Sequence, residues 1–91
     1  MCLDYEWDEE KNAANKRKHG IGFEEINKFN WNLAVGTETQ YVDGEYRDVW
    51  IGPLPSGLIA SIVTERKEVT RVISLRKATN HEKQKWTDEF R

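Results

Sequence analysis

The pattern of hydrophobic and polar residues predicts helices near the start of the chain. Asp8 is a favourable N-cap, acidic residues follow it, and Gly20 is typical of the position just after a helix, so we expect a helix that ends at about residue 19. A second helix is expected over residues 23–30 (FEEINKFN). Residues 3–7 alternate apolar and polar side chains, which is typical of a short edge strand.

The middle of the chain has the pattern of strands. Thr37–Val42 and Glu45–Ile51 flank Asp43-Gly44, a pair typical of a two-residue hairpin turn. Residues 52–57 (GPLPSG) are rich in Gly and Pro, so we expect a loop there.

Two further strands and a helix are expected after this loop. Leu58–Thr64 is almost continuously apolar, as in a central strand that is buried on both faces. A charged turn and a strand over Val69–Leu75 follow. Thr79 and Glu82 have the spacing of a capping box, which predicts that the last helix starts near residue 79.

This order of elements predicts an α+β fold in a single domain over residues 1–91. It consists of two N-terminal helices, an antiparallel sheet of three to four strands and a C-terminal helix.

Charge is distributed unevenly along the chain, although the net charge is only −2. Residues 1–10 are acidic, 11–20 are basic, 21–63 are acidic again, and 64–91 have a basic excess. The two basic segments form one phosphate-binding surface if they meet in space, or two solvated faces if they do not.

The first expected helix carries an unusual polar stripe. Lys11, Asn15 and Lys18 fall on one face at 100° per residue, and His19 ends the helix. Histidine titrates near neutral pH, which suits proton transfer. The alternatives are an exposed polar face and a histidine that only caps the helix.

The segment 65–85 is dense in cations. Arginine presents a planar fork that matches phosphate oxygens. In a regular strand Arg71 lies on the face of Ile73 and Leu75, and Arg76 lies on the other, so both reach one site only if Arg76 lies beyond the strand. The alternatives are ion pairs. Arg71 would pair with Glu65, with Glu68 or with an acid of the first segment, and Arg76 would pair at the start of the last helix.

Several functional classes are excluded by what the sequence lacks. It has no nucleotide-binding glycine motif and no GxSxG motif. Its single cysteine, Cys2, forms no disulfide framework, and one cysteine with two histidines is not a zinc site. We therefore expect no metal and no cofactor. The N-terminus does not resemble a signal peptide, and no stretch is long enough to span a membrane, so a cytoplasmic protein is expected.

Two spaced motifs resemble those of the BrnT family of toxins. The first, WDEEKNAANKRKHGIGFEEI, is met by Trp7, Asp8, Lys11, Asn15, Lys18, His19, Gly20, Ile21, Phe23, Glu24, Glu25 and Ile26. The second, VTRVISLRKATNHEKQKW, is met by Arg71, Ile73, Ser74, Arg76, Ala78 and Glu82. Leu75 departs from the alanine that is common in the family. The resemblance covers nearly the whole chain. Because the two motifs occur in the right order, the signal is more specific than either motif alone.

This resemblance implies a ribonuclease toxin of a type II toxin–antitoxin system with a RelE-like fold. Its activity would be metal-independent RNA cleavage that arrests growth. A BrnA-like, DNA-binding antitoxin would neutralise it and connect it indirectly to operator DNA.

On that basis we assign roles to the candidate residues. The catalytic candidates are His19, Arg71, Arg76 and Glu68, with the arginines stabilising charge on phosphate and His19 or Glu68 transferring protons. The RNA-binding candidates are Lys11, Asn15, Lys18, Arg66 and Lys77. The competing functions are a catalytically inactive corepressor that binds the antitoxin, and a plain nucleic-acid-binding module.

Overall fold

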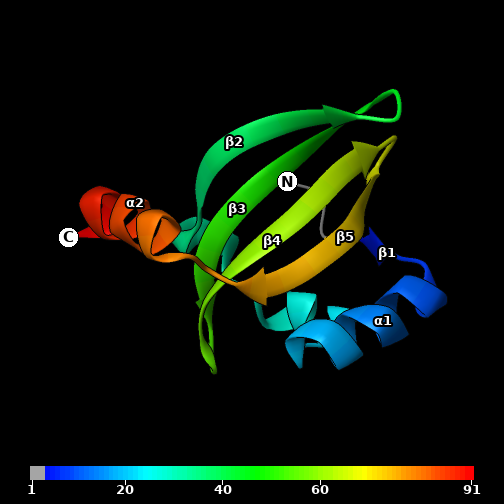
Figure 1. Cartoon of the computed structure of the whole chain (residues 1–91). Coiled ribbons are helices and arrows are strands. Elements are labelled where there is room, and N and C mark those ends of the chain that lie inside the picture. The colour runs from blue at the N-terminus through cyan, green and yellow to red at the C-terminus, as the bar shows by residue number, and fades with distance from the viewer. Residues whose placement is uncertain (1–3) are drawn as a thin grey trace.

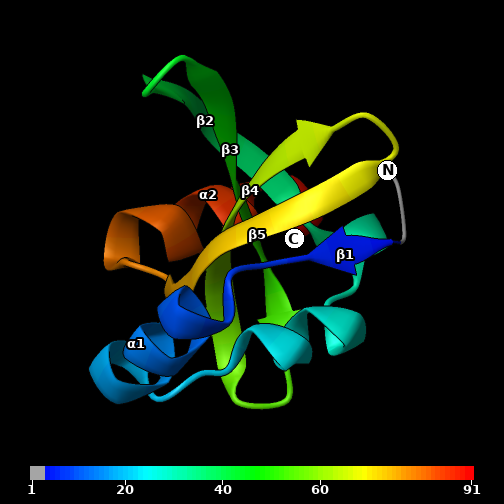
Figure 2. The same cartoon turned by 90° about the vertical axis from the view of Figure 1, so that its right-hand side faces the viewer.

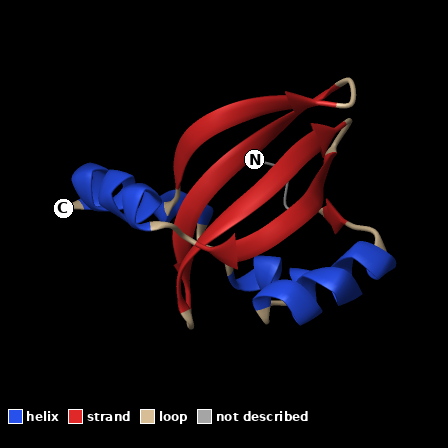
Figure 3. Ribbon diagram, in the orientation of Figure 1, coloured by secondary structure: helices blue, strands red, loops and turns tan. Residues whose placement is uncertain are grey.

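The computed structural model describes residues 4–91 and contains a twisted sheet that carries helices on both faces (Figures 1 and 3). In chain order the elements are β1 (Tyr5–Glu6), α1 (Glu9–His19), the 3₁₀ helices η1 (Phe23–Lys28) and η2 (Trp31–Leu33), β2 (Val35–Val42), β3 (Glu45–Leu54), β4 (Gly57–Arg66), β5 (Val69–Lys77) and α2 (Asn80–Phe90). Cys2 and the first residue of the expected strand over 3–7 lie outside the described residues.

The sheet has five strands in the order β1-β5-β4-β3-β2, and β1 runs parallel to β5 (Figure 2). The expectation of an antiparallel sheet of three to four strands, as part of a RelE-like arrangement, is therefore wrong. Strand β1 pairs only Tyr5 with Thr70 and Glu6 with Arg71. Partners so far apart in sequence leave no trace in a local pattern.

The expected second N-terminal helix is also wrong, because the chain forms two short 3₁₀ helices there. The buried side chains of this segment are Phe23, Ile26 and Phe29, which are spaced three residues apart. A 3₁₀ helix has three residues per turn, so this spacing places Phe23 and Ile26 on one face of η1. Phe29 follows as the extended C-cap residue.

Strand β3 extends through most of the expected loop, and only Pro55 and Ser56 form the turn. Pro53 is tolerated because β2 pairs with β3 no further than Ile51. Its missing N–H therefore interrupts no ladder. Gly52 lies against the Phe29 ring, and a Cβ there would approach the ring within 2.7 Å.

The turns and helix ends agree with the sequence patterns. Asp43 and Gly44 both have positive φ, at 50° and 81°, as a type I′ hairpin turn requires. Asp8 caps α1 at its N-terminus, and Gly20 closes it with φ of 74°. The Thr79–Glu82 capping box starts α2, so these predictions are confirmed.

Each face of the sheet has its own hydrophobic core. The core under α1, η1 and η2 consists of Ile21, Phe23, Ile26, Phe29, Leu54, Ile59, Val72 and Leu75. The core under α2 consists of Val49, Ile51, Ala60, Ile62 and Ala78. The expected central strand is confirmed, since β4 contributes to both cores. No helix within residues 4–91 is long and apolar enough to cross a membrane.

Helix α1 is held to the sheet by amide side chains, because its buried residues are Asn12 and Asn15. The Asn15 Nδ2 donates to the Leu75 carbonyl (2.8 Å) and to the Ile21 carbonyl (2.9 Å). Its Oδ1 accepts from the Leu75 N–H (3.4 Å) and from the Ser74 hydroxyl (3.2 Å). The Asn15 side chain thus replaces a neighbouring strand at the edge of β5.

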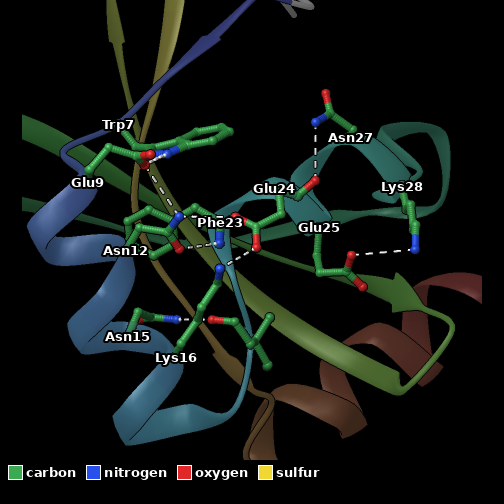
Figure 4. Close-up of polar contacts among 11 residues, drawn as sticks. Trp7, Glu9, Asn12, Asn15, Lys16, Phe23, Glu24, Glu25, Asn27 and Lys28 are labelled. Carbon is green, nitrogen blue, oxygen red and sulfur yellow. Dashed lines mark hydrogen bonds and ion pairs between the residues drawn. The ribbon is translucent and has the colours of Figure 1, made fainter.

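A second amide ties α1 to η1 (Figure 4). The Asn12 Oδ1 accepts from the Phe23 N–H (2.8 Å), and its Nδ2 donates to the Glu24 carboxylate (3.0 Å). Glu24 also pairs with Lys16 at 2.7 Å. The inward face of α1 is therefore specified by polar geometry rather than by apolar burial.

Substitution Asn15→Ala is expected to lower the free energy of unfolding by about 2–3 kcal/mol, because buried backbone groups of Ile21 and Leu75 lose their partner. Asn27→Ala is the matched control, since Asn27 is exposed and makes one bond, to the Glu24 carbonyl. Urea unfolding of both variants measures the difference. Equal losses would show that the Asn15 bonds contribute nothing specific.

Candidate functional site

A basic hollow lies where the end of α1 meets the end of β5. Its volume is about 420 Å³, and its lining residues are Lys18, His19, Arg76, Lys77 and Thr79. None of these side chains is acidic. The fold therefore brings together four of the residues singled out from the two basic segments of the sequence, which are more than 50 positions apart.

Local structure explains how these side chains reach one place. Gly20 ends α1, so Lys18 and His19 lie in its last turn. Asn15, one turn earlier, fixes that end of the helix against Leu75. Arg76 is the next residue of β5, so the anchored strand position and the anchored helix turn are adjacent.

A second hollow, of about 230 Å³, continues along the same junction toward the start of α1. Its lining residues are Lys11, Ala14, Asn15, Lys18, His19, Ile73 and Ser74. Lys11 and Lys18 are exposed, whereas Asn15 is buried and all its amide hydrogen bonds are made inside the protein. Asn15 thus lies in the floor of this hollow.

Arg76 forms a two-pronged ion pair with Glu82 on α2. Its Nη1 donates to Glu82 Oε1 at 2.8 Å, and its Nη2 donates to Oε2 at 3.0 Å. Glu82 also accepts from the Thr79 N–H at 2.9 Å. These contacts lower the pKa of Glu82 to about 2, chiefly through the Arg76 hydrogen bond, and raise the pKa of Arg76. The expected alternative, a pair at the start of the last helix, is therefore present.

Arg71 lies on the same face of the sheet as Arg76 but far along the strand. A bulge at Ile73 changes the alternation, so that Arg71 pairs with Thr64 and Arg76 with Ala60. Those partners are four residues apart on β4, which corresponds to about 13 Å. Arg71 forms its ion pair with Glu6 of β1. Both arginines thus share a face without sharing the hollow.

The two remaining candidates lie at the other end of β5. Glu68 belongs to the turn between β4 and β5, and Arg66 ends β4. The Arg66 Nη2 lies 2.9 Å from the Glu45 carboxylate at the base of the β2–β3 hairpin. The structure does not bring these residues to His19. Thr79 is the lining residue that sequence reasoning did not assign to the site, and its capping-box spacing was the available signal.

Other hollows differ in charge from the two along α1. One, of about 360 Å³ between β2 and α2, is lined by Glu38 and Glu82 among others. Another, of about 300 Å³ beside β3, is lined by Glu38 and Asp48. Residues 4–91 hold no group of three or more His, Cys, Asp and Glu side chains placed to bind a metal ion. The α1–β5 junction therefore has the lining best suited to an anion.

Comparison with known families identifies the class of protein to which the chain belongs. Residues 7–82 match the model of the family described as "Ribonuclease toxin, BrnT, of type II toxin-antitoxin system". The chain belongs to the BrnT family of ribonuclease toxins. The matched range includes every residue that lines the two hollows of the α1–β5 junction.

A solved structure agrees with this assignment. The chain is similar to the ribonuclease toxin BrnT of Brucella abortus, with 29% sequence identity and a TM-score of 0.67. The match covers 85% of this chain and 99% of that one. No protein of curated function matches the chain significantly. As a BrnT-family member, the chain is a ribonuclease toxin of a type II toxin–antitoxin system, with RNA as substrate and an antitoxin as partner.

Replacement of Glu82 by Gln is expected to reduce stability by about 2 kcal/mol near pH 7, since Arg76 and the Thr79 N–H lose a charged partner. Because the pKa of Glu82 is lowered from 4.5 to about 2, the stability it adds is complete above pH 4.5. It disappears as the pH falls toward 2.

Urea unfolding at several pH values measures this effect, with Glu89→Gln on the exposed side of α2 as control. The gap between wild type and Glu82→Gln should close between pH 4.5 and 2. A gap that persists unchanged at pH 2 would contradict the ion-pair account.

Proposed function

We propose that this BrnT-family toxin cleaves RNA at the hollow lined by Lys18, His19, Arg76 and Lys77, without a metal ion. The observation that carries the proposal is the meeting of the two basic segments around a histidine, with no acid in the lining. Lys18 and Lys77 form no ion pair among the described residues, so their charges are available to phosphate.

The chemistry is attack of the RNA 2′-hydroxyl on the adjacent phosphorus. The 2′-oxygen gains a bond to phosphorus and loses its proton to a base. The bond from phosphorus to the 5′-oxygen breaks, and the 5′-oxygen takes a proton from water as it leaves. Products are a 2′,3′-cyclic phosphate and a 5′-hydroxyl. We assign the proton transfer at the 2′-oxygen to His19, since arginine stays protonated.

Arg76 is assigned to stabilise the charge that develops on the phosphate. Its bonds to Glu82 and to the Lys77 carbonyl occupy Nη1 and one N–H of Nη2. Nε and the remaining N–H of Nη2 are left for phosphate oxygens. Glu82 contacts the guanidinium through the two Nη atoms and leaves its other donors available, so the ion pair is compatible with the catalytic role.

Metal independence is supported by the electrostatics of the lining. A divalent cation in this hollow would meet two lysines and an arginine and no carboxylate. The same cations neutralise the negative charge of a phosphate directly. In other nucleases a bound magnesium ion has this role.

The neutralising antitoxin is proposed to be BrnA-like and to bind DNA, so that the complex reaches operator DNA through the antitoxin. Support comes from charge: residues 38–48 hold Glu38, Asp43, Glu45 and Asp48 against Arg47. Such an acidic hairpin complements a basic partner and repels RNA.

Purified protein is expected to cleave a single-stranded RNA in the presence of EDTA, and to leave the 2′-deoxy version of the same strand intact. His19→Gln should lower the cleavage rate by about 100-fold or more. Lys83→Gln, which removes an exposed cation outside the hollow, should not.

The role of Arg76 needs a paired design, because removing it alone would leave Glu82 without its partner. The double variant Arg76→Gln, Glu82→Gln should lose cleavage, whereas Glu82→Gln alone should retain most of it. Wild-type protein that binds the antitoxin but leaves RNA intact would instead favour the inactive corepressor.

A further inference from the structure

The two hollows of the α1–β5 junction form one continuous basic path. Lys18 and His19 line both of them. One hollow extends toward Arg76 and Lys77, and the other extends back along α1 to Lys11. A strand of RNA that occupies the first hollow therefore has a second one directly beside it.

Helix geometry makes the second hollow suitable for a phosphate of the same strand. Lys11 and Lys18 are seven residues apart, which is two turns of helix, so both point from one face. The rise along the axis between them is about 10 Å. Successive phosphates of one RNA strand are separated by a single ribose, so two lysines at this separation lie within reach of neighbouring phosphates.

Ion pairing separates Lys11 from the other cations nearby. On the same helix, Lys16 pairs with Glu24 at 2.7 Å and faces η1. Across the sheet edge, Arg71 pairs with Glu6. Lys11 and Lys18 take part in no ion pair among residues 4–91 and are exposed. Within residues 4–91, their charges are therefore not neutralised by an ion pair with a carboxylate.

The floor of the second hollow is hydrogen-bonded to the sheet and free of carboxylates. Asn15 and Ser74 are hydrogen-bonded to each other at 3.2 Å, and Asn15 is fixed to Leu75. Partly buried Ile73 adds an apolar side chain to the lining. An anion here meets two ammonium groups and no repulsive charge in the lining.

We propose that the hollow lined by Lys11, Lys18 and Ser74 binds a second backbone phosphate of the RNA, next to the phosphate held over His19 and Arg76. The inference rests on the proposed cleavage site and adds a binding subsite to it. Recognition at this subsite is of backbone charge, so it increases affinity for longer strands and is independent of base sequence.

Binding of a 2′-O-methyl hexaribonucleotide, which resists attack, tests the subsite by fluorescence anisotropy. Lys11→Gln should weaken binding about fivefold at low salt and reduce the slope of log affinity against log salt by about 0.7. Lys11→Arg should restore both. Lys83→Gln, on an exposed side of α2, is the matched control and should change neither.

A dinucleoside monophosphate, which carries one phosphate, distinguishes a second subsite from general attraction. Its inhibition constant for RNA cleavage should be the same within about twofold for wild type and Lys11→Gln. If Lys11→Gln behaves like Lys83→Gln on the hexamer, or weakens both ligands equally, the subsite is disproved while cleavage by the wild type still stands. If the wild type neither binds nor cleaves RNA, both proposals fail.

Discussion

Asn15 places one carboxamide among a helix, a loop and the edge of a sheet. Its bonds to Ile21 and Leu75 take the place of a strand that β5 lacks at this point, because β1 pairs only with the other end of β5. Helix α1 has no apolar face that would hold it there. Asn15 therefore contributes directly to the position of Lys18 and His19 relative to Arg76, and Asn12 ties the same helix to η1.

A division among the cations accounts for both stability and function. Arg71 and Lys16 are engaged by carboxylates that fasten β1 and η1, whereas Lys11 and Lys18 remain exposed along the junction. Arg76 belongs to both groups, since Glu82 holds it from one side and the hollow is open on the other. This separation explains how a chain of net charge −2 carries a basic surface at the α1–β5 junction.

Sequence patterns were sufficient wherever the controlling interaction is local. The Asp43-Gly44 turn, the Gly20 helix end and the Thr79–Glu82 capping box each follow from a few neighbouring residues. The pairing of β1 with β5 and the bulge at Ile73 depend on distant partners, so local patterns do not contain them. Because of this bulge, the prediction that Arg71 and Leu75 lie on the same face of the strand, which assumed regular alternation, is wrong.

The candidate site was predictable in part for the same reason. Charge segregation singled out two basic segments without showing that they meet in space, and the family motifs selected His19 and Arg76 from them. Nothing local indicated that Asn15 is buried as a strand substitute, or that Arg66 and Glu68 lie at the far end of β5. Those distinctions require the three-dimensional register of β5.

The most direct test of the account is to map a bound, non-cleavable RNA strand onto the protein by NMR chemical-shift changes of backbone amides. A ribonuclease site at the α1–β5 junction predicts the largest changes at Lys18, His19, Arg76 and Lys77, with further changes along α1 toward Lys11. Changes concentrated instead at the β2–β3 hairpin, or around Arg66 and Arg71, would contradict the assignment of the ribonuclease site to the α1–β5 junction.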